Sequence, residues 1–287
     1  MIRNYFLPLL FTTVCWFFFA GCSSKPKEAT AKKPLITVSI APIAYFTEAI
    51  AGDYCEVATM IRAGFSPESY EPTAQQLMRL NQSSAYFSTP GIGFELQWME
   101  RMHIMVPSMT IYDMSAGISL VHPHKTGPVD PHIWTSVRTA KKICHTIANS
   151  LAAIDTLHAA YYQLRNDSMQ QVLTVLDKKI EQTLLHACHN RSFAIYHPSL
   201  TYFAQDYGLQ QFPLEQEGKE PAVSDVHAFI MRCKAANVKT VFLQEEFSEE
   251  QVRTIATEIG ARTVRVSPLS YQWDKQMLHL LKALCDE

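Results

Sequence analysis

The stretch TLHAAYYQLRNDSMQQVLTVLDKKIEQTLLH, residues 156–186, decides the predicted architecture of the chain. It contains neither glycine nor proline, and apolar residues recur along it at helical spacing, namely Leu157, Tyr161, Leu164, Val172, Leu176, Ile180 and Leu184. About thirty helical residues form a rod on the order of 45 Å long, which is more than the width of one domain. We therefore predict one long rigid helix, assigned to residues 155–189, that joins two lobes.

Strands and helices alternate on both sides of this predicted helix. Short β-branched or aromatic runs, each followed by a segment of helical periodicity, begin near Leu35, Cys55, Ala85, Thr110, Ser192, Leu209, Lys239 and Thr263. This alternation is typical of the α/β class, in which helices cover a mostly parallel sheet. We predict an N-terminal α/β lobe over residues 34–154 and a C-terminal α/β lobe over residues 190–287.

The N-terminus has the pattern of a processing signal. Arg3 precedes an apolar run from Tyr5 to Phe19, which Pro8 interrupts and which is too short for a membrane span. The following Ala-Gly-Cys22 resembles a bacterial lipobox, which implies cleavage before Cys22 and acylation of its sulfur. We predict a signal peptide over residues 1–21, a polar tether over 22–33, and a mature chain anchored by lipid in the cell envelope, on the periplasmic face or the cell surface.

Composition excludes some functions and leaves the cysteines open. The 287 residues carry 25 basic and 27 acidic side chains, a net charge of −2, so no basic surface for nucleic acid is expected. Five cysteines follow Cys22, and their odd number leaves at least one thiol free. Spacing does not settle the pairing. Cys144 falls in an apolar helical stripe and is predicted to be core, and we expect Cys233 to pair with Cys285, with Cys55 and Cys188 as the other thiols.

Polar residues stand where ligands collect in α/β folds, at or beyond the carboxyl ends of strands. His132 lies between a proline and large apolar residues in Asp130–Trp134, so its backbone is held rigidly. His197 directly follows one predicted strand, Ser267 ends another, and Glu68 lies in the loop after a third. Imidazoles and carboxylates are the ligands that transition metals prefer. The sequence therefore predicts a metal site between the two lobes.

Four motifs extend this prediction to a family. They are residues 66–73 (SPESYEPT), 130–134 (DPHIW), 196–209 (YHPSLTYFAQDYGL) and 267–269 (SPL), in this order. With them, essentially the whole mature chain resembles the zinc/manganese-type substrate-binding lipoproteins of metal ABC transporters. The resemblance implies two α/β lobes joined by one long helix, with the metal held in the cleft between them. It also implies a monomer without enzymatic activity whose partner is an ABC permease.

The resemblance implies metal ligands residue by residue. The second and third histidines of the family site fall on His132 and His197. The first position, usually histidine, falls on Glu68, and the fourth, usually aspartate, falls on Ser267. Water, Gln244 or Glu245 are further candidates for the fourth ligand. Two imidazoles and a carboxylate suit Zn²⁺, and Mn²⁺ or Fe²⁺ with added oxygen ligands. Many zinc-binding relatives carry a long histidine-rich loop, of which His122-Pro-His124 is the only remnant here.

Three other functions remain open from the sequence. A zinc hydrolase would need an open metal position and a base, for which Glu245 or Glu246 are candidates, but no His-Glu-x-x-His motif occurs. A binding protein for an iron chelate, haem or cobalamin would need a broad aromatic or basic cleft on the same fold. An adhesive surface lipoprotein is the third alternative. We expect capture of a divalent metal, Zn²⁺ before Mn²⁺ or Fe²⁺, as a transported ligand.

Overall fold

The computed structural model describes Met1 and residues 33–122, 129–215, 222–245 and 247–285. The chain divides into a short unit, Met1–Lys32, and one compact unit, Lys33–Glu287, which is described below. Cys22 and nearly all of the predicted signal peptide and tether lie outside the described residues. Within the described residues, no helix combines the length and apolar character needed to cross a membrane.

The N-terminal lobe contains a four-stranded parallel sheet in the order β2-β1-β3-β4. Its strands are β1 (Leu35–Val38), β2 (Glu56–Thr59), β3 (Ala85–Ser88) and β4 (Thr110–Asp113). Its helices are α1 (Ala41–Ala51), the 3-10 turn η1 (Gly52–Tyr54), α2 (Ala74–Leu80) and α3 (Gly93–Met105). β1 and β3 are buried along their whole length, as expected for central strands of a parallel sheet covered on both faces.

The C-terminal lobe repeats this arrangement with a sheet in the order β6-β5-β7-β8, again all parallel. Its strands are β5 (Ser192–Ile195), β6 (Gln210–Pro213), β7 (Thr240–Gln244) and β8 (Arg262–Val266). Its helices are α6 (Thr201–Tyr207), α7 (Val223–Ala235), α8 (Glu249–Ile259) and α9 (Trp273–Cys285). Gly208 ends α6 in the left-handed conformation, φ 63°, which glycine adopts without strain. The predicted α/β class and the alternation of elements are confirmed.

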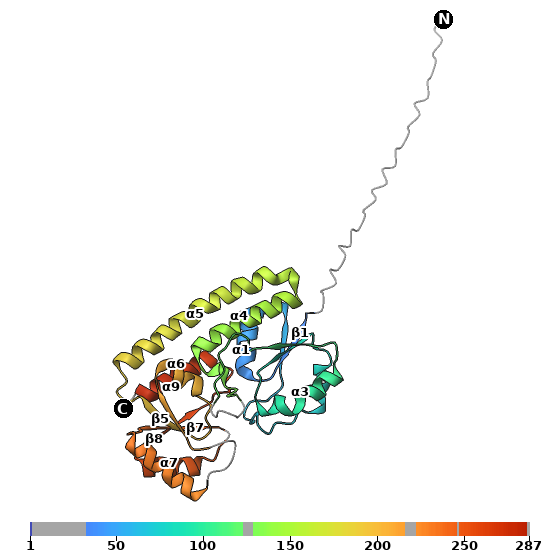
Figure 1. Cartoon of the computed structure of the whole chain (residues 1–287). Coiled ribbons are helices and arrows are strands. Elements are labelled where there is room, and N and C mark those ends of the chain that lie inside the picture. Colours follow the sequence, from blue (N-terminus) through green and yellow to red (C-terminus); the bar gives the residue numbers. More distant parts are fainter. Residues whose placement is uncertain (2–32, 123–128, 216–221, 246, 286–287) are drawn as a thin grey trace. The chain divides into compact units, whose positions relative to one another are not determined.

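Two helices that run side by side, α4 and α5, lie between the sheets in sequence (Figure 1). The 3-10 turn η2 (Ile133–Thr135) leads into α4 (Val137–Ile154), and η3 (Thr156–His158) leads into α5 (Ala159–His186). Ser136 caps α4 by accepting a hydrogen bond from the backbone of Arg138, at 3.2 Å. With 28 residues, α5 is about 42 Å long, so the predicted long linking helix is confirmed.

The buried face of α5 differs from the predicted one in its first half. Leu157, which lies in η3 just before α5, is 85% exposed, and Leu164 and Val172 of α5 are 65% and 56% exposed. The buried residues of α5 are Tyr162, Asn166, Leu173, Leu176, Ile180 and Leu184. α5 packs against α4 along one face, and apolar residues also occur on its other face, so spacing alone selected the wrong stripe.

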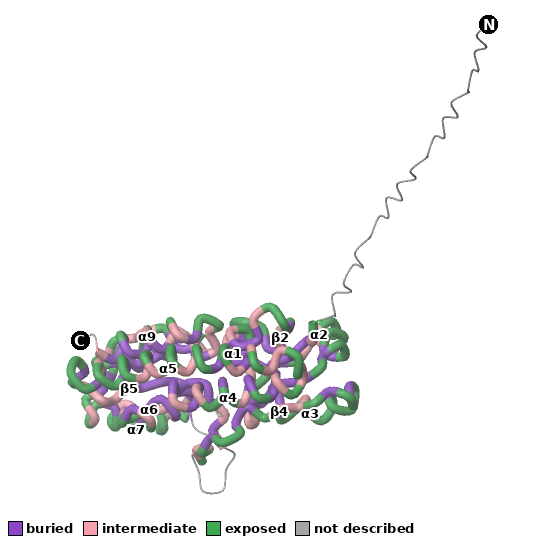
Figure 2. The backbone as a smooth tube through the Cα atoms, turned by 90° about the horizontal axis from the view of Figure 1, so that it is seen from above, coloured by how far each residue is buried: buried purple, intermediate pink, exposed green. Residues whose placement is uncertain are grey.

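One continuous hydrophobic core joins the lobes through α4 and α5. Buried segments occur in both lobes and in the helices between them (Figure 2). Along β5 the side chains alternate, because successive residues of a strand point to opposite faces. Phe193 and Ile195 belong to the joint core, whereas Ala194 and Tyr196 belong to a second cluster on the other face of the C-terminal sheet. The joint core makes the two lobes resist separation.

The disulfide pairing expected from the sequence is wrong. Cys285 pairs with Cys188, and Cys233 is a buried free thiol, as are Cys55 and Cys144. The end of α5 and the end of α9 meet in space, which brings Cys188 and Cys285 together. Cys233 lies instead in the cluster on the other face of the sheet. Cys144 is fully buried core as predicted, and burial raises the pKa of its thiol.

Candidate metal centre

Two imidazoles from different lobes face one another. His132 immediately precedes η2, and His197 lies two residues beyond the end of β5. Their Nε2 atoms are 3.3 Å apart. The structure therefore brings together two of the predicted ligands, which are separated by 65 residues in the sequence.

A carboxylate holds the far side of each imidazole. Asp130 Oδ1 lies 2.7 Å from His132 Nδ1 and also accepts the backbone N–H of His132 at 2.9 Å. Glu215 Oε2 lies 3.0 Å from His197 Nδ1. Because an ionised carboxylate can only accept, each Nδ1 carries a hydrogen, which leaves the two Nε2 atoms that face each other as the nitrogens available to a metal ion.

Burial and charge set the protonation of this group. Burial alone would raise the pKa of Asp130, but its hydrogen bonds to His132 and the charge there lower it, so Asp130 is a carboxylate. For His197, burial disfavours the charged ring, yet the hydrogen bond and charge of Glu215 prevail, together with the charges of Glu68 and Asp130, and raise its pKa. The surroundings therefore favour a positive charge between the rings.

The spacing of the two Nε2 atoms fits a bound metal. Two nitrogens at the usual Zn–N length on a tetrahedral ion lie about 3.3–3.4 Å apart. The observed separation is 3.3 Å. Two facing lone pairs at this distance repel each other unless a proton or a metal ion lies between them. The pair formed by His132 and His197 can thus bind a metal with little rearrangement of either ring.

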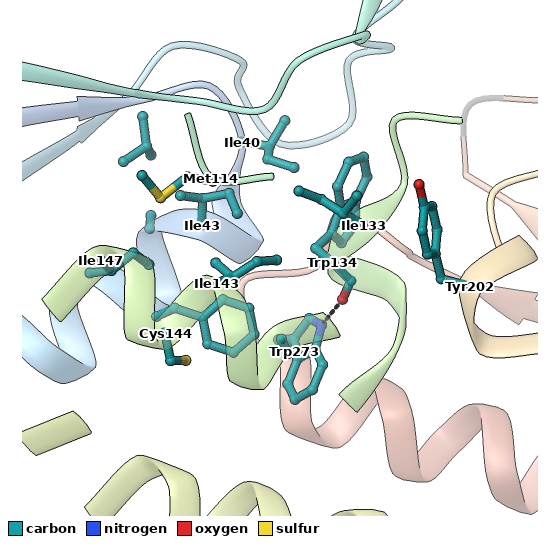
Figure 3. Close-up of a cluster of buried hydrophobic side chains, with 14 of the residues drawn as sticks. Ile40, Ile43, Met114, Ile133, Trp134, Ile143, Cys144, Ile147, Tyr202 and Trp273 are labelled. Carbon is teal, nitrogen blue, oxygen red and sulfur yellow. Dashed lines mark hydrogen bonds between the residues drawn. The ribbon is translucent and has the colours of Figure 1, made fainter. Parts of the chain in front are cut away.

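Hydrogen bonds across the two lobes hold the His132 segment in place. The Trp134 indole donates to the carbonyl of Pro268 at 2.9 Å, and the Trp273 indole donates to the carbonyl of Trp134 at 2.6 Å (Figure 3). Tyr202 donates to the carbonyl of Asp130 at 2.8 Å. Trp134 and Trp273 are each 1% exposed, so these bonds are made inside the core. They position His132 from the C-terminal lobe.

Gln244 is not a free metal ligand. Its side-chain oxygen accepts the backbone N–H of His197 at 2.9 Å, and its amide nitrogen donates to the Ser199 hydroxyl at 3.0 Å. Gln244 therefore positions His197, and the expectation that it could complete the metal shell is not supported. Glu245 follows it and is exposed.

Glu68 lies on an exposed loop that packs against the start of α3. Gln97 donates to the carbonyl of Glu68 at 3.2 Å, and the backbone of Phe94 donates to the carbonyl of Pro67 at 2.8 Å. A Cβ added at Gly93 would lie 2.8 Å from the Glu68 Cα and 2.9 Å from its carbonyl oxygen, so only glycine permits this approach. The charge of Glu68 contributes to the raised pKa of His197, which puts it within electrostatic range of the imidazole pair.

Ser267 lies at the end of β8 and is partly exposed. β7 separates β8 from β5, which places Ser267 two strands from the strand that carries His197. In the part of the chain that the structure describes, the Ser267 hydroxyl has no hydrogen-bond partner. It is therefore uncommitted, but the structure does not join it to the imidazoles.

No group of three or more His, Cys, Asp or Glu side chains is arranged to hold a metal among the described residues. The imidazole pair is in place, whereas Glu68 is near it without joining it. Of the two histidines that stand for the family's histidine-rich loop, His122 is exposed, and His124 lies outside the described residues. Glu246, one of the bases considered for a hydrolase, also lies outside the described residues.

Comparison with protein families identifies the family to which the chain belongs. Residues 36–284 match the family described as zinc-uptake complex component A, periplasmic, or ZnuA. The chain belongs to the ZnuA family. The family is named for a component of a metal-uptake complex, in agreement with the resemblance seen in the sequence motifs.

Relatives of this ZnuA-family chain include binding proteins for several metals. The zinc-binding lipoprotein AdcA of Streptococcus pneumoniae is 26% identical over 280 residues, which cover 92% of this chain and 55% of AdcA. The chain thus spans about half the length of that relative. A zinc-bound deletion mutant of ZnuA is 33% identical with a TM-score of 0.82, covering 89% of this chain and 99% of that one. The binding protein FpvC of Pseudomonas aeruginosa with Mn²⁺ is 26% identical with a TM-score of 0.76, covering 88% and 98%.

Sequence reasoning did not single out Glu215, which lies against His197 in the candidate site of this ZnuA-family chain. It follows β6, the neighbour of β5 in the sheet, so its side chain reaches the same edge as His197. The rule that ligands gather beyond strand ends could have found it, because Glu215 stands two residues past the end of β6.

Proposed function

We propose that this ZnuA-family protein captures Zn²⁺ outside the cytoplasmic membrane and delivers it to an ABC permease, without catalysing a reaction. The observation that carries the proposal is the pair of Nε2 atoms of His132 and His197, which face each other at 3.3 Å. A carboxylate behind each ring holds a hydrogen on Nδ1, so Nε2 is the nitrogen left to bind a metal when the ring is neutral.

Glu68 supplies the third ligand and Ser267 or a water the fourth. Two nitrogens and a carboxylate oxygen are a usual set for Zn²⁺, and added oxygens would adapt it to Mn²⁺ or Fe²⁺. Because Glu68 lies on an exposed loop, its carboxylate closes on the ion only after the imidazoles have bound it. Metal binding therefore lowers the free energy of a closed form, which the permease distinguishes from the open one.

We assign the N-terminal lobe to residues 34–154, the linking helix to 155–189 and the C-terminal lobe to 190–287. The joint hydrophobic core and the buried tryptophan hydrogen bonds support a small tilt of the lobes with ordering of the Glu68 loop. A wide hinge motion would break these contacts.

The protein acts as a monomer held at the membrane by an acylated Cys22, after removal of residues 1–21. The AdcA name, which includes the word lipoprotein, supports this placement. Labelling with a radioactive fatty acid tests it. We expect label on the wild-type protein and none on a Cys22→Ser variant, and equal labelling of both would refute the anchor.

Metal titration tests the proposed site. Zinc binding is measured by calorimetry for the wild type, for the Glu68→Ala/His132→Ala/His197→Ala variant and for a His145→Ala control, which removes an exposed histidine of α4. We expect high-affinity binding in the wild type and the control and none in the triple variant. Competition with Mn²⁺ then ranks the metals. If the triple variant bound Zn²⁺ as tightly as the wild type, the assignment would be wrong.

A further inference from the structure

A hollow of about 690 Å³ lies at the end of the C-terminal sheet opposite to His197. Its lining comes from the segments that enter β5 and β7 and from the first residue of β8 (Figure 1). In a parallel sheet all strands start at the same edge, so these segments lie together. The lining residues are His189, Asn190, Arg191, Ser192, Ala236, Asn237, Lys239 and Arg262.

Among the residues that the structure describes, the hollow concentrates positive charge without a matching acid. Arg191, Lys239 and Arg262 are cationic at neutral pH, His189 adds a further basic group, and the lining contains no Asp or Glu. Among the described residues none of these four makes a salt bridge, although arginines elsewhere on the chain do. Like charges around one concavity repel each other, so an anion placed there lowers the energy of all of them.

The two guanidinium groups are held in place by neutral acceptors. Arg262 donates to the carbonyl of Ala283 at 2.7 Å and to the Thr240 hydroxyl at 3.4 Å. Arg191 donates to the carbonyl of Tyr207 at 3.3 Å. A guanidinium has five N–H donors, so each keeps several for a ligand while its orientation is set.

The backbone of the rim is also fixed. Asn190 donates to the carbonyl of Asn237 at 2.6 Å and accepts the backbone N–H of Ser192 at 2.8 Å. Asn237 itself adopts a positive φ of 51°, the only non-glycine residue to do so among those described. The disulfide between Cys188 and Cys285 ties the residue before His189 to the end of α9. The hollow is therefore a formed feature of the fold.

We propose that this hollow binds a phosphate-bearing anion, either a soluble phosphate compound or the headgroup phosphate of an anionic phospholipid. Donors approach from three strands, which suits a tetrahedral oxyanion with several charged oxygens better than a single carboxylate. The proposal is independent of the metal centre, which lies at the other edge of the sheet.

The test uses the full chain with Cys22→Ser, which cannot be acylated. Pyrophosphate binding is measured by calorimetry, and vesicle binding by co-sedimentation with phosphatidylglycerol or phosphatidylcholine. The test variant is His189→Gln/Lys239→Gln, because both side chains are exposed and neither makes a hydrogen bond or salt bridge with a described residue. Lys234→Gln is the matched control, since it removes an exposed cation of α7 outside the hollow.

We expect the double variant to bind pyrophosphate or phosphatidylglycerol vesicles about tenfold more weakly, and the control to bind like the unaltered protein. Zinc affinity and thermal unfolding should be unchanged in all three. Binding of pyrophosphate alone identifies a soluble phosphate compound, and binding of phosphatidylglycerol alone identifies a headgroup.

Three results would overturn the proposal. The first is no binding of either probe, and the second is an equal loss in the Lys234→Gln control. The third is that pyrophosphate or phosphatidylglycerol binds only to an Asp286→Asn/Glu287→Gln variant. The hollow would then serve to hold the acidic residues that follow Cys285 in the sequence, and not a phosphate.

Discussion

The nitrogen half and the oxygen half of the candidate site are built differently. His132 and His197 each have a carboxylate on Nδ1. The indole of Trp273 donates a hydrogen bond to the backbone next to His132, and the Gln244 side-chain oxygen accepts the backbone N–H of His197. Glu68 is on an exposed loop, and the Ser267 hydroxyl has no partner among the described residues. We infer that the two imidazoles are already in position before a metal binds, whereas the proposed oxygen ligands move to the ion when it binds.

Removing one imidazole is expected to have the largest effect. For His132→Ala or His197→Ala we expect zinc affinity to fall at least about 1,000-fold, or about 4 kcal/mol, because a preorganised ligand is lost. Calorimetry at fixed pH measures it. A loss of zinc affinity no greater than that of Glu68→Ala would contradict the view that the imidazoles are preorganised and the oxygen ligands are not.

Glu95 lies in α3, the helix against which the Glu68 loop packs, and it allows the stability of this region to be tested. It lies in the first turn of α3, accepts hydrogen bonds from Ser39 and from the backbone of Thr89, and is 5% exposed. Burial raises the pKa of its carboxyl from 4.5 to about 7. Such a carboxyl contributes its full stabilisation below the pKa that it has in the unfolded chain. This contribution is lost as the pH rises through the pKa that the carboxyl has in the folded protein.

For Glu95→Gln we therefore expect little change in the free energy of unfolding near pH 4.5, relative to the wild type. Above about pH 7 the variant should be more stable by up to about 3 kcal/mol, because it has no buried charge. Urea unfolding of the zinc-free proteins across this pH range measures the difference. A difference that does not change with pH would show that Glu95 does not titrate as stated.

The carboxylates behind the imidazoles should rank next. We expect Asp130→Ala and Glu215→Ala each to weaken zinc binding about 10–100-fold, since the rings lose the partners that fix their tautomers. Asp130→Asn and Glu215→Gln should recover part of this affinity by keeping an acceptor. If the isosteric variants bound no better than the alanine variants, the orienting role would be refuted.

Gly93 connects α3 to the Glu68 loop. A Cβ there would collide with the Glu68 backbone, so Gly93→Ala should displace the loop and weaken zinc binding by about tenfold, the same loss that we expect for Glu68→Ala. The double variant Gly93→Ala/Glu68→Ala should bind no worse than either single variant, which calorimetry can establish. Additive losses would mean that Gly93 acts elsewhere.

Ser267 should matter least. A neutral hydroxyl two strands from His197 adds little to a bound cation, so we expect Ser267→Ala to change zinc affinity less than about threefold. Ser267→Asp should tighten binding if this position faces the ion. A large loss of zinc affinity in Ser267→Ala would show that Ser267, like the imidazoles, is in position before the metal binds.

The motifs around His132 and His197 predicted the imidazole pair correctly because each is surrounded by local signals, a proline and an aromatic in one case and a strand end in the other. The exposed stripe of α5 and the disulfide of Cys285 could not be predicted in the same way. A long helix with apolar residues on two faces does not reveal which face packs. Likewise, the spacing of cysteines does not reveal which helix ends meet.

The sequence alone was enough to predict the order of strands and helices, the long helix between the lobes and two histidines that the structure brings face to face. These depend on periodicity and on residues adjacent in the chain. Three contacts could be seen only in the folded protein. Glu215 lies against Nδ1 of His197, the Gln244 side chain accepts the backbone N–H of His197, and the Trp273 indole donates to the carbonyl of Trp134. Each of these contacts joins residues from separate elements, because the packing of two sheets against α4 and α5 brings them together.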